Sequence, residues 1–324
     1  MPRVTRRHLA LALKVAVAIS LTALFLHYAS PAQILRALRS ANPWLVSTII
    51  PLTLVCMALA ALQLKILTDC HGMKVGLAQI VHINSSTEFY SLFLPGVIAG
   101  GALRWYRLSR DNQMRAQALV AIAANRALNV VALLAVGIAG WLLGDEPPGT
   151  AVFCWFLVAC VVAIAVLAFV LRHPRFASSL RARPGGRRLL PSRLYAGWLK
   201  MLDALREYRR IPPLERARMM AYVVGWQLAN VLGTYLLCLA LDMDVGMGTI
   251  AWIRAMLGLA LMLPITVGGF GIREGGWIYF LAFHSVAPAD AFALSLLTFV
   301  RTLFQAMIGF ALEIRTLFRL AARG

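Results

Sequence analysis

Charged residues are scarce in this chain, and acidic residues are scarcer still. Of its 324 residues only 14% are charged, 13 are Asp or Glu, and 60% are hydrophobic. A composition this apolar excludes a soluble globular protein and indicates an integral membrane protein. The net charge of +19, which would suggest a nucleic-acid partner in a soluble protein, therefore does not predict one here.

Several signatures of catalysis and metal binding are also missing. The five cysteines have no CxxC spacing, which argues against a disulfide framework or a zinc site, and the histidines are scattered without ligand spacing. No nucleophile elbow, Walker loop, pair of metal carboxylates or dinucleotide fingerprint occurs. We therefore expect no metal, no cofactor and no ATP hydrolysis by this chain.

What the chain does contain is a set of long apolar runs. Each is near the roughly 20 residues that cross a hydrocarbon core of about 30 Å. They cover residues 9–27, 44–64, 116–143, 151–171, 219–241 and 289–312. Their length without alternation excludes a closed β-barrel and predicts an all-α bundle with about six full spans. The first run follows a basic start, and its length favours an uncleaved anchor over a cleaved signal peptide.

Two further apolar segments carry nearly the same motif, LPGVIAGGALR at 94–104 and LPITVGGFGIR at 263–273. Each has Leu-Pro, a short apolar spacer, paired glycines and an arginine nine residues after the proline. Proline lacks an N–H and glycine does not restrict its backbone, so neither segment continues a straight helix. We expect two re-entrant broken-helix hairpins, over 75–110 and 249–284, that carry an arginine to membrane depth.

The distribution of basic residues predicts the topology. The segment 172–218 holds 13 basic and three acidic residues, a net charge of +10, which indicates a cytoplasmic loop. With both termini cytoplasmic, the first hairpin opens to the cytoplasm and the second to the exterior. The single transmembrane domain, 1–324, then divides into halves 9–171 and 219–318 of opposite orientation, the inverted-topology repeat of many secondary transporters.

A second match supports this duplication and brings in two more arginines. AQALVAIAANR at 116–126 aligns with AFALSLLTFVR at 291–301 at a constant offset of 175. Arg126 and Arg301 therefore occupy matching positions deep in apolar helices, where each charge costs roughly 2.5–3.5 kcal/mol unless it finds a partner or water. One alternative is internal salt bridging, Arg126 with Glu88 and Arg301 with Glu274.

The candidate site combines these charges with the hairpin glycines. Arginine binds phosphate or carboxylate through two parallel hydrogen bonds, and exposed glycine N–H groups form an anion-binding concavity. An alternative role for the paired glycines is close helix packing. The predicted substrate-binding residues are Arg104, Arg126, Arg273, Arg301, Glu88, Glu274, Gly100, Gly101, Gly268 and Gly269.

Polar residues distinguish the two hairpins. The segment 84–90 before the first break holds Asn84, Ser85, Ser86, Thr87, Glu88 and Tyr90, whereas 257–263 before the second is apolar. This asymmetry suggests that the first hairpin lines a wet cavity. Gln227 and Asn230 either face the same cavity or form hydrogen bonds between helices.

At these residues the chain resembles the flippase-like family of the lysylphosphatidylglycerol synthase transmembrane region, which includes the membrane half of the bacterial multiple peptide resistance factor. The resemblance runs from about residue 9 to 318 and rests on LPGVIAGGALR, ANRALNVVALL at 124–134 and LPITVGGFGIREGG at 263–276. It implies a lipid-handling membrane protein in which an anionic headgroup meets Arg104, Arg126, Arg273 and Arg301. Relatives are associated with aminoacylated phospholipids, polyprenyl-linked sugars and other envelope lipids.

The expected function is a flippase-like translocator, in a bacterial inner membrane, of a lipid with an anionic phosphate headgroup. Because the chain ends at Gly324 without a soluble aminoacyl transferase domain, we expect it not to make lysyl-lipid alone. Two alternatives are an integral membrane transferase that uses Glu88 or Glu274 as general base, and a non-catalytic partner of a lipid synthase. A homo-oligomer is compatible with each.

Overall fold

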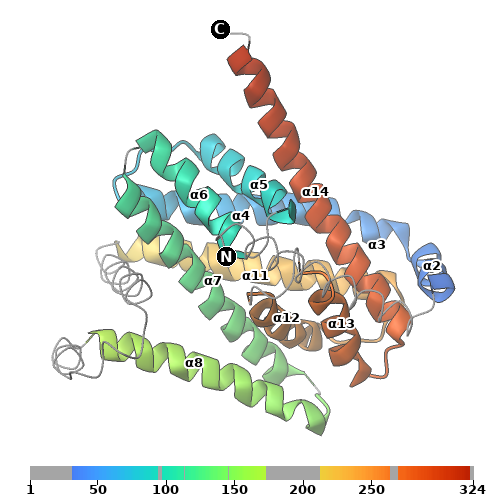
Figure 1. The fold of residues 1–324 in the computed structure, drawn as a ribbon. Helices are drawn as coiled ribbons and strands as arrows, with labels where there is room; N and C mark the ends of the chain where they lie inside the picture. Colours follow the sequence, from blue (N-terminus) through green and yellow to red (C-terminus); the bar gives the residue numbers. More distant parts are fainter. Residues whose placement is uncertain are drawn as a thin grey trace, which may run out of the picture.

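The computed structural model is a bundle of α-helices (Figure 1). It describes residues 31–93, 97–112, 114–144, 146–172, 212–262 and 269–321. The expected first span at 9–27, most of the basic loop at 172–218, the Leu-Pro steps of both motifs and Gly268 lie outside these residues. In chain order the helices are α2 (Pro31–Ser40), α3 (Pro43–Ser47), α4 (Ile49–Cys70), α5 (Leu77–Phe93), α6 (Val97–Asn112), α7 (Arg115–Leu143), the short η1 (Pro148–Thr150), α8 (Ala151–Arg172), α11 (Pro213–Ala240), α12 (Met247–Met262), α13 (Ile272–Ala282) and α14 (Pro288–Ala321).

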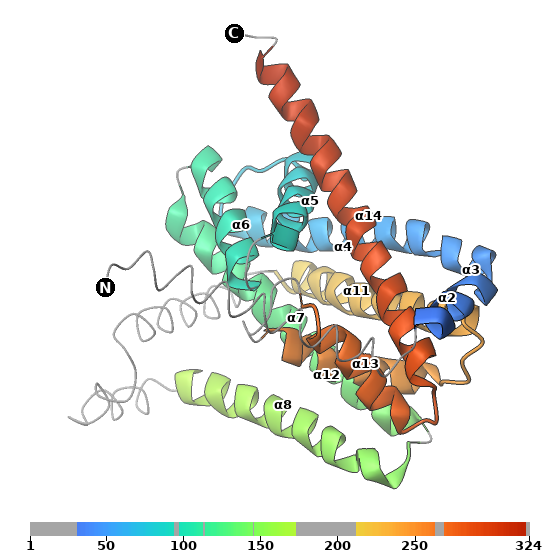
Figure 2. The same cartoon turned by 45° about the vertical axis from the view of Figure 1, so that its right-hand side comes forward.

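Four helices are long and apolar enough to cross a membrane: Pro43–Cys70, Arg115–Leu143, Pro213–Ala240 and Pro288–Arg315. They coincide with four of the six predicted spans. A fifth prediction falls on α8, which lies along one edge of the bundle against α7 (Figures 1 and 2). Helices satisfy every backbone hydrogen bond within the segment, as lipid requires. The chain is a multi-pass membrane protein.

The antiparallel pair of α4 and α11 forms the middle of the bundle (Figure 1). A Cβ at Gly225 would lie 3.6 Å from Leu59, and one at Gly233 would lie 3.6 Å from Leu52. At one end of the pair, the Asn42 N–H donates to the Ala240 carbonyl at 2.8 Å. The glycines of α11 therefore let leucines of α4 lie against its backbone.

The two shorter helix pairs, α5–α6 and α12–α13, pack across the bundle. α5 lies along α14, and α12 lies along α7, so each pair meets the long helix that follows the other pair (Figure 2). Glycines allow both contacts: a Cβ at Gly309 of α14 would overlap the Ser85 carbonyl of α5, and one at Gly137 of α7 would overlap Ala255 of α12. Small residues at such crossings bring helix backbones close together.

The turns that lead into α5 and α12 are built alike. In each, the same five backbone hydrogen bonds recur with residue numbers shifted by 170. In the first turn, the series begins with the His71 N–H donating to the Thr68 carbonyl and ends with the Ile80 N–H donating to the Gly76 carbonyl. In the second, it begins with Leu241 and Cys238 and ends with Ile250 and Gly246. A left-handed residue occupies the same place in both, Gly72 at φ 73° and Asp242 at φ 56°. The matching sequences, Met-Lys-Val-Gly at 73–76 and Met-Asp-Val-Gly at 243–246, are a second repeat signal that the motif analysis missed.

Two apolar clusters lie at opposite ends of α4. The cluster around Leu67 gathers Ile80 near the start of α5 and Leu108 near the end of α6. The cluster around Ile49 gathers Ile250 near the start of α12 and Leu281 at the end of α13. The two helix pairs therefore begin and end at opposite ends of the bundle.

Candidate functional site

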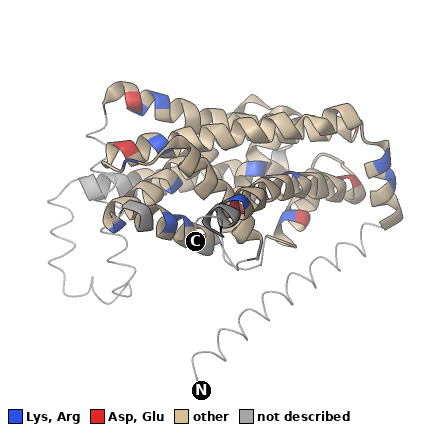
Figure 3. Cartoon of the chain, turned by 90° about the horizontal axis from the view of Figure 1, so that it is seen from above, with Lys and Arg blue, Asp and Glu red and all other residues tan. Residues whose placement is uncertain are grey.

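Lys and Arg positions occur along the helices as well as at their ends (Figure 3). The arginines predicted for the site fall into three groups, each on different helices, and no contact among the described residues joins the three groups into one. A fourth group of charges, which the motifs did not predict, links α5, α6 and α14.

The first group lies at the first hairpin. Arg104 of α6 donates from Nη2 to Oε1 of Glu88 on α5 at 3.4 Å, and these side chains are 19% and 37% exposed. Arg126 on α7 is exposed, interacts electrostatically with both residues, and forms no salt bridge with any described residue. The alternative pairing of Arg126 with Glu88 is therefore wrong, because Glu88 instead contacts the arginine that its own hairpin supplies.

The hairpin glycines differ in what surrounds them. A Cβ at Gly100 would meet the Ser91 side chain, so this glycine allows α5 and α6 to approach, whereas a Cβ at Gly101 would meet nothing within 4 Å. Gly269 has φ 77° and a Cβ there would lie 2.7 Å from Leu261. Gly100 therefore permits a close approach of α5 and α6, and Gly269 takes a left-handed conformation that favours glycine; anion binding by these glycines stays a prediction.

The second group opens α13. Gly271, at φ 85°, donates its N–H to Glu274 Oε2 at 2.6 Å, so the carboxylate caps the helix. Arg273 donates from Nη2 to Glu274 Oε1 at 2.6 Å and from Nε to the Ser295 hydroxyl at 3.2 Å. Its guanidinium also lies over the rings of Phe270 and Phe299, at 5.3 and 4.8 Å from their centroids. Glu274, 2% exposed, is thus occupied by Arg273, and the alternative pairing of Glu274 with Arg301 is wrong.

The third group gathers on α11. Arg301 of α14 donates from Nη2 to Asn230 Oδ1, and Arg254 of α12 donates from Nη1 to Thr234 Oγ1 at 2.8 Å. Within the described part of the chain neither guanidinium has a carboxylate partner. Sequence reasoning missed Arg254, although a charge in the middle of an apolar helix was the signal used for Arg126 and Arg301.

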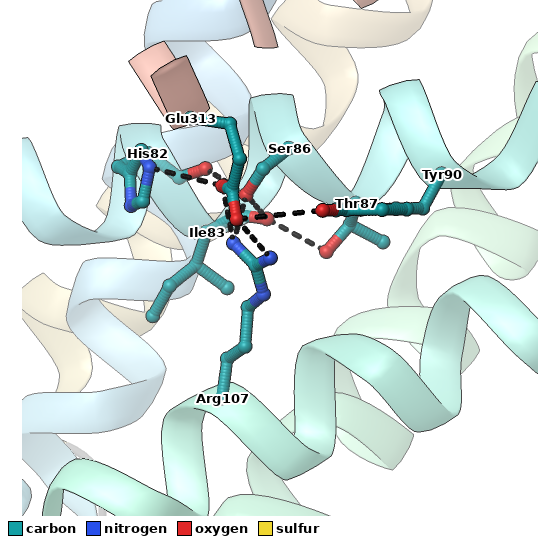
Figure 4. A network of polar contacts seen from close by, with 7 residues as sticks. All are labelled: His82, Ile83, Ser86, Thr87, Tyr90, Arg107 and Glu313. Atoms are coloured by element: carbon teal, nitrogen blue, oxygen red, sulfur yellow. Dashed lines mark hydrogen bonds and ion pairs between the residues drawn. The ribbon is translucent and has the colours of Figure 1, made fainter. Parts of the chain in front are cut away.

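The fourth group is a network around Glu313 of α14 (Figure 4). Arg107 of α6 donates to both carboxylate oxygens, at 2.9 and 2.8 Å, and to the Ser86 hydroxyl at 2.6 Å. His82 Nε2 lies 3.3 Å from Oε2, and the Tyr90 hydroxyl donates to Oε1 at 3.5 Å. The pairing is bidentate, which is the strong geometry for Arg and carboxylate. Nothing in the hairpin motif predicted it.

The polar residues of α5 are buried. Ser85, Ser86 and Thr87 are 1%, 0% and 2% exposed. Ser86 donates to the His82 carbonyl and Thr87 to the Ile83 carbonyl, both at 2.6 Å. This segment therefore packs against α14 within the protein, and the expected wet lining does not hold for these three side chains.

The two amides of α11 take the interhelical alternative. Gln227 donates from Nε2 to the Asn129 carbonyl of α7 at 3.0 Å. Asn230 holds Arg301 and approaches Cys56 Sγ of α4 at 3.5 Å. Among the described residues no cluster of three or more His, Cys, Asp or Glu suited to a metal occurs.

The buried side chain of Glu146 lies in the turn after α7, at the end of the bundle where α12 begins and α13 ends. The Thr249 hydroxyl of α12 donates to Glu146 Oε1 at 2.6 Å, and His284 Nε2 lies 3.2 Å from Oε2. Burial opposes ionisation of this carboxyl, but the interactions with His284, Thr249 and Trp252 outweigh it and hold the pKa of Glu146 below its ordinary value. Glu146 thus fastens both ends of the α12–α13 pair to the turn.

Comparison with known proteins adds the family. No curated protein and no solved structure matches the chain. The profile of the family described as the lysylphosphatidylglycerol synthase TM region matches residues 11–309, which include all the arginines of the groups above but not Glu313. The chain therefore belongs to the family of the lysylphosphatidylglycerol synthase transmembrane region.

Proposed function

We propose that this chain is a flippase-like translocator of a membrane lipid with an anionic phosphate headgroup, in a bacterial inner membrane. The observation that carries the proposal is charge balance. Arg126, Arg254 and Arg301 lie in apolar helices and form no salt bridge with a described residue. Each such charge costs roughly 2.5–3.5 kcal/mol at the centre of a membrane helix, and an anionic headgroup would offset that cost.

The proposed movement is alternating access between two inverted repeats, α4–α7 and α11–α14. Three features support it: the matching turns before α5 and α12, the reciprocal packing of α5 on α14 and α12 on α7, and the opposite ends at which the two hairpins begin. In transporters built this way, rocking of one repeat against the other exposes a central site to each side in turn.

The arginines paired with carboxylates have a different proposed role. Arg104 and Arg273 would exchange Glu88 and Glu274 for the phosphate as it passes, and the carboxylates would displace it again by pairing with the arginines. The 3.4 Å contact of Arg104 with a 37% exposed Glu88 suits such an exchange better than the 2.6 Å contact of Arg273 with the buried Glu274. Arg104 is therefore the first candidate for this exchange.

The test measures lipid movement directly. Purified protein in liposomes should accelerate the transfer between leaflets of at least one of two fluorescent lipids, phosphatidic acid and phosphatidylglycerol, followed by dithionite quenching. Arg301→Gln should slow this transfer roughly tenfold or more, because it removes a charge-assisted contact worth about 1.5–3 kcal/mol. Arg218→Gln, at a 54% exposed side chain near the start of α11, is the matched control and should keep the wild-type rate.

The result that overturns the proposal is equally direct. Wild-type protein that moves neither lipid faster than empty liposomes, or Arg301→Gln protein that elutes as folded wild type does and moves the lipid at the wild-type rate, would refute it.

A further inference from the structure

We infer that Arg254 and Arg301 together form a binding site for a doubly charged phosphate, a monoester or a diphosphate, as opposed to a singly charged phosphodiester. The inference rests on the proposed function, since it assigns the headgroup class that this part of the site accepts. It starts from Arg254, which no motif singled out.

The two guanidiniums converge on one turn of α11. Arg254 comes from α12 and binds the Thr234 hydroxyl at 2.8 Å, while Arg301 comes from α14 and binds the Asn230 amide oxygen. The Thr234 hydroxyl in turn donates to the Asn230 carbonyl at 3.0 Å. Residues four apart on a helix have Cβ atoms about 5–6 Å from each other, so the anchors of the two arginines are neighbours.

Gly233 makes room for this arrangement. A Cβ at this position would lie 3.9 Å from Arg301 Nη1, so the guanidinium rests against the bare backbone of α11. The site is therefore made by three helices: α11 supplies the anchors, α12 and α14 the charges.

The anchors satisfy hydrogen bonds without balancing charge. A hydroxyl and an amide are neutral, and each guanidinium has five N–H groups in a rigid fork. Arg254 Nε is buried without a hydrogen-bond acceptor, and the positive charges of Arg254 and Arg301 repel one another. Unused donors and two uncompensated charges are together what a phosphate with several acceptor oxygens would satisfy.

The number of uncompensated positive charges at the pair indicates the class of phosphate. Every other interior arginine group holds a carboxylate: Glu88 beside Arg104, Glu274 beside Arg273, Glu313 beside Arg107. The Arg254–Arg301 pair holds none among the described residues. A phosphodiester carries one negative charge and would leave one positive charge uncompensated, at roughly 2.5–3.5 kcal/mol in a membrane interior. A phosphomonoester carries about −1.5 to −2 at neutral pH and balances both.

The experiment compares two lipids of identical acyl chains whose phosphates carry different charges. Full-length protein in phosphatidylcholine nanodiscs is titrated with phosphatidic acid, a phosphomonoester, or with phosphatidylglycerol, a phosphodiester, of identical acyl chains, and binding is followed by tryptophan fluorescence. Phosphatidic acid should bind roughly tenfold or more tightly, since the second charge removes a cost of at least 1.4 kcal/mol. Equal affinity for the two lipids would overturn the inference.

Variants test whether the pair creates the preference. Arg254→Gln should bind both lipids within about twofold of each other, because one positive charge remains. Arg254→Lys, which keeps the charge, should retain the preference for phosphatidic acid, and Arg218→Gln should leave both affinities unchanged. A preference that survives in Arg254→Gln would assign the selectivity to other residues and refute the inference.

A measurement on the wild-type protein keeps the inference testable if Arg254→Gln does not fold. The second ionisation of a phosphomonoester has a pKa near 6, so the preference should shrink at about pH 5 and be full at about pH 8. The titratable group that faces both arginines is the Cys56 thiol of α4; a thiol has an ordinary pKa of about 8.5 and stays mostly protonated up to about pH 8. Asn230, Thr234 and Gly233, which contact the pair, do not titrate. A preference that is the same at both pH values would contradict a charge-based site.

Inorganic pyrophosphate distinguishes a lipid headgroup from a free anion. If it binds as tightly as phosphatidic acid, the dianion site serves a soluble phosphate; if it binds more weakly, the acyl chains contribute and the ligand is a lipid. Either result is consistent with a doubly charged ligand. Binding is measured without translocation, so selective binding without lipid movement would overturn the proposed function alone, and movement of phosphatidylglycerol without selective binding would overturn this inference alone.

Discussion

The two hairpin regions share a backbone plan and differ in charge. The turns before α5 and α12 have the same hydrogen bonds, and each of these helices packs against the long helix that follows the other hairpin. Yet the contact of α5 and α6 with α14 is fastened by Arg107 and Glu313, while α12 brings into the bundle Arg254, which has no carboxylate partner among the described residues. The first region therefore holds α14 through an ion pair, and the second presents an arginine for which the described residues supply no carboxylate.

This contrast distinguishes a contact that stabilises the fold from one at which we propose that a ligand binds. A bidentate ion pair that is 20% and 18% exposed resists separation, because parting the charges leaves both without a partner in a medium of low dielectric constant. Two like charges held by neutral anchors gain from the arrival of an anion. The equivalent helix contacts therefore carry an ion pair in one half and, in the other, arginines without a described carboxylate partner, where we propose that an anion binds.

The largest expected effect comes from removing the Arg107–Glu313 ion pair. Glu313→Gln should lower the free energy of unfolding by about 3–5 kcal/mol, because Arg107 loses its carboxylate inside the protein. Thermal or denaturant unfolding in detergent, followed by circular dichroism, checks this. Glu88→Gln, at the longer and more exposed contact with Arg104, should cost no more than about 1 kcal/mol. Equal losses in the two variants would contradict the distinction drawn between these pairs.

The next effect concerns the glycines at the crossings. Gly309→Ala should destabilise the protein by about 1–3 kcal/mol, because the new methyl group overlaps the Ser85 backbone, which cannot move aside cheaply. Gly101→Ala, where a Cβ meets nothing, should be neutral or stabilising by up to about 1 kcal/mol, since alanine favours a helix. Melting temperatures of the purified variants distinguish them, and a tolerated Gly309→Ala would show that α5 does not lie so close to α14.

A third effect concerns the fastening of the second hairpin and depends on pH. The pKa of Glu146 is lowered in the folded protein, so its stabilisation is complete above the ordinary carboxyl pKa of about 4.3 and is lost as pH falls through the lower folded value. Glu146→Gln should cost about 1–3 kcal/mol at neutral pH and remove that part of the acid sensitivity. Unfolding curves at several pH values check both statements. If the variant loses stability at acidic pH as the wild type does, another group is responsible for that loss.

The smallest effect sharpens the comparison of the two turns. Gly72→Ala should cost roughly 1 kcal/mol, because φ of 73° is unfavourable for a side chain. At the equivalent place Asp242→Gly should stabilise the protein by about 0.5 kcal/mol, because its φ of 56° is relaxed by glycine. Opposite shifts of the melting temperature would support equivalent turns, and shifts of the same sign would argue against it.

Much of the architecture was predictable from local sequence. Four spans follow from apolar runs alone, since the thickness of the hydrocarbon core sets their length. The starts of the paired helices also follow from a local signal, the Met-x-Val-Gly turns, although the motif analysis used the Pro-Gly-Gly steps instead. Local patterns suffice here because a helix in lipid must satisfy its own backbone.

The partners of the charges were less predictable. Glu88 contacts Arg104, sixteen residues away in its own hairpin, whereas Glu313 reaches Arg107 across more than 200 residues of sequence. The sequence showed that Arg126 and Arg301 lie deep in apolar helices, but the alternative in which Glu88 and Glu274 pair with them is wrong, because those carboxylates contact Arg104 and Arg273. Arg254 was not predicted, because no motif surrounds it.

The amino-acid sequence by itself determined that this is a multi-pass α-helical membrane protein of a lipid-associated family with arginines in apolar helices, because hydrophobic length and motif spacing are properties of neighbouring residues. Only the tertiary structure decided which arginines meet carboxylates and which have no carboxylate partner among the described residues. That outcome depends on the crossing of α5 with α14 and on the convergence of α12 and α14 on α11, and such crossings are decided by side-chain packing between segments distant in the chain.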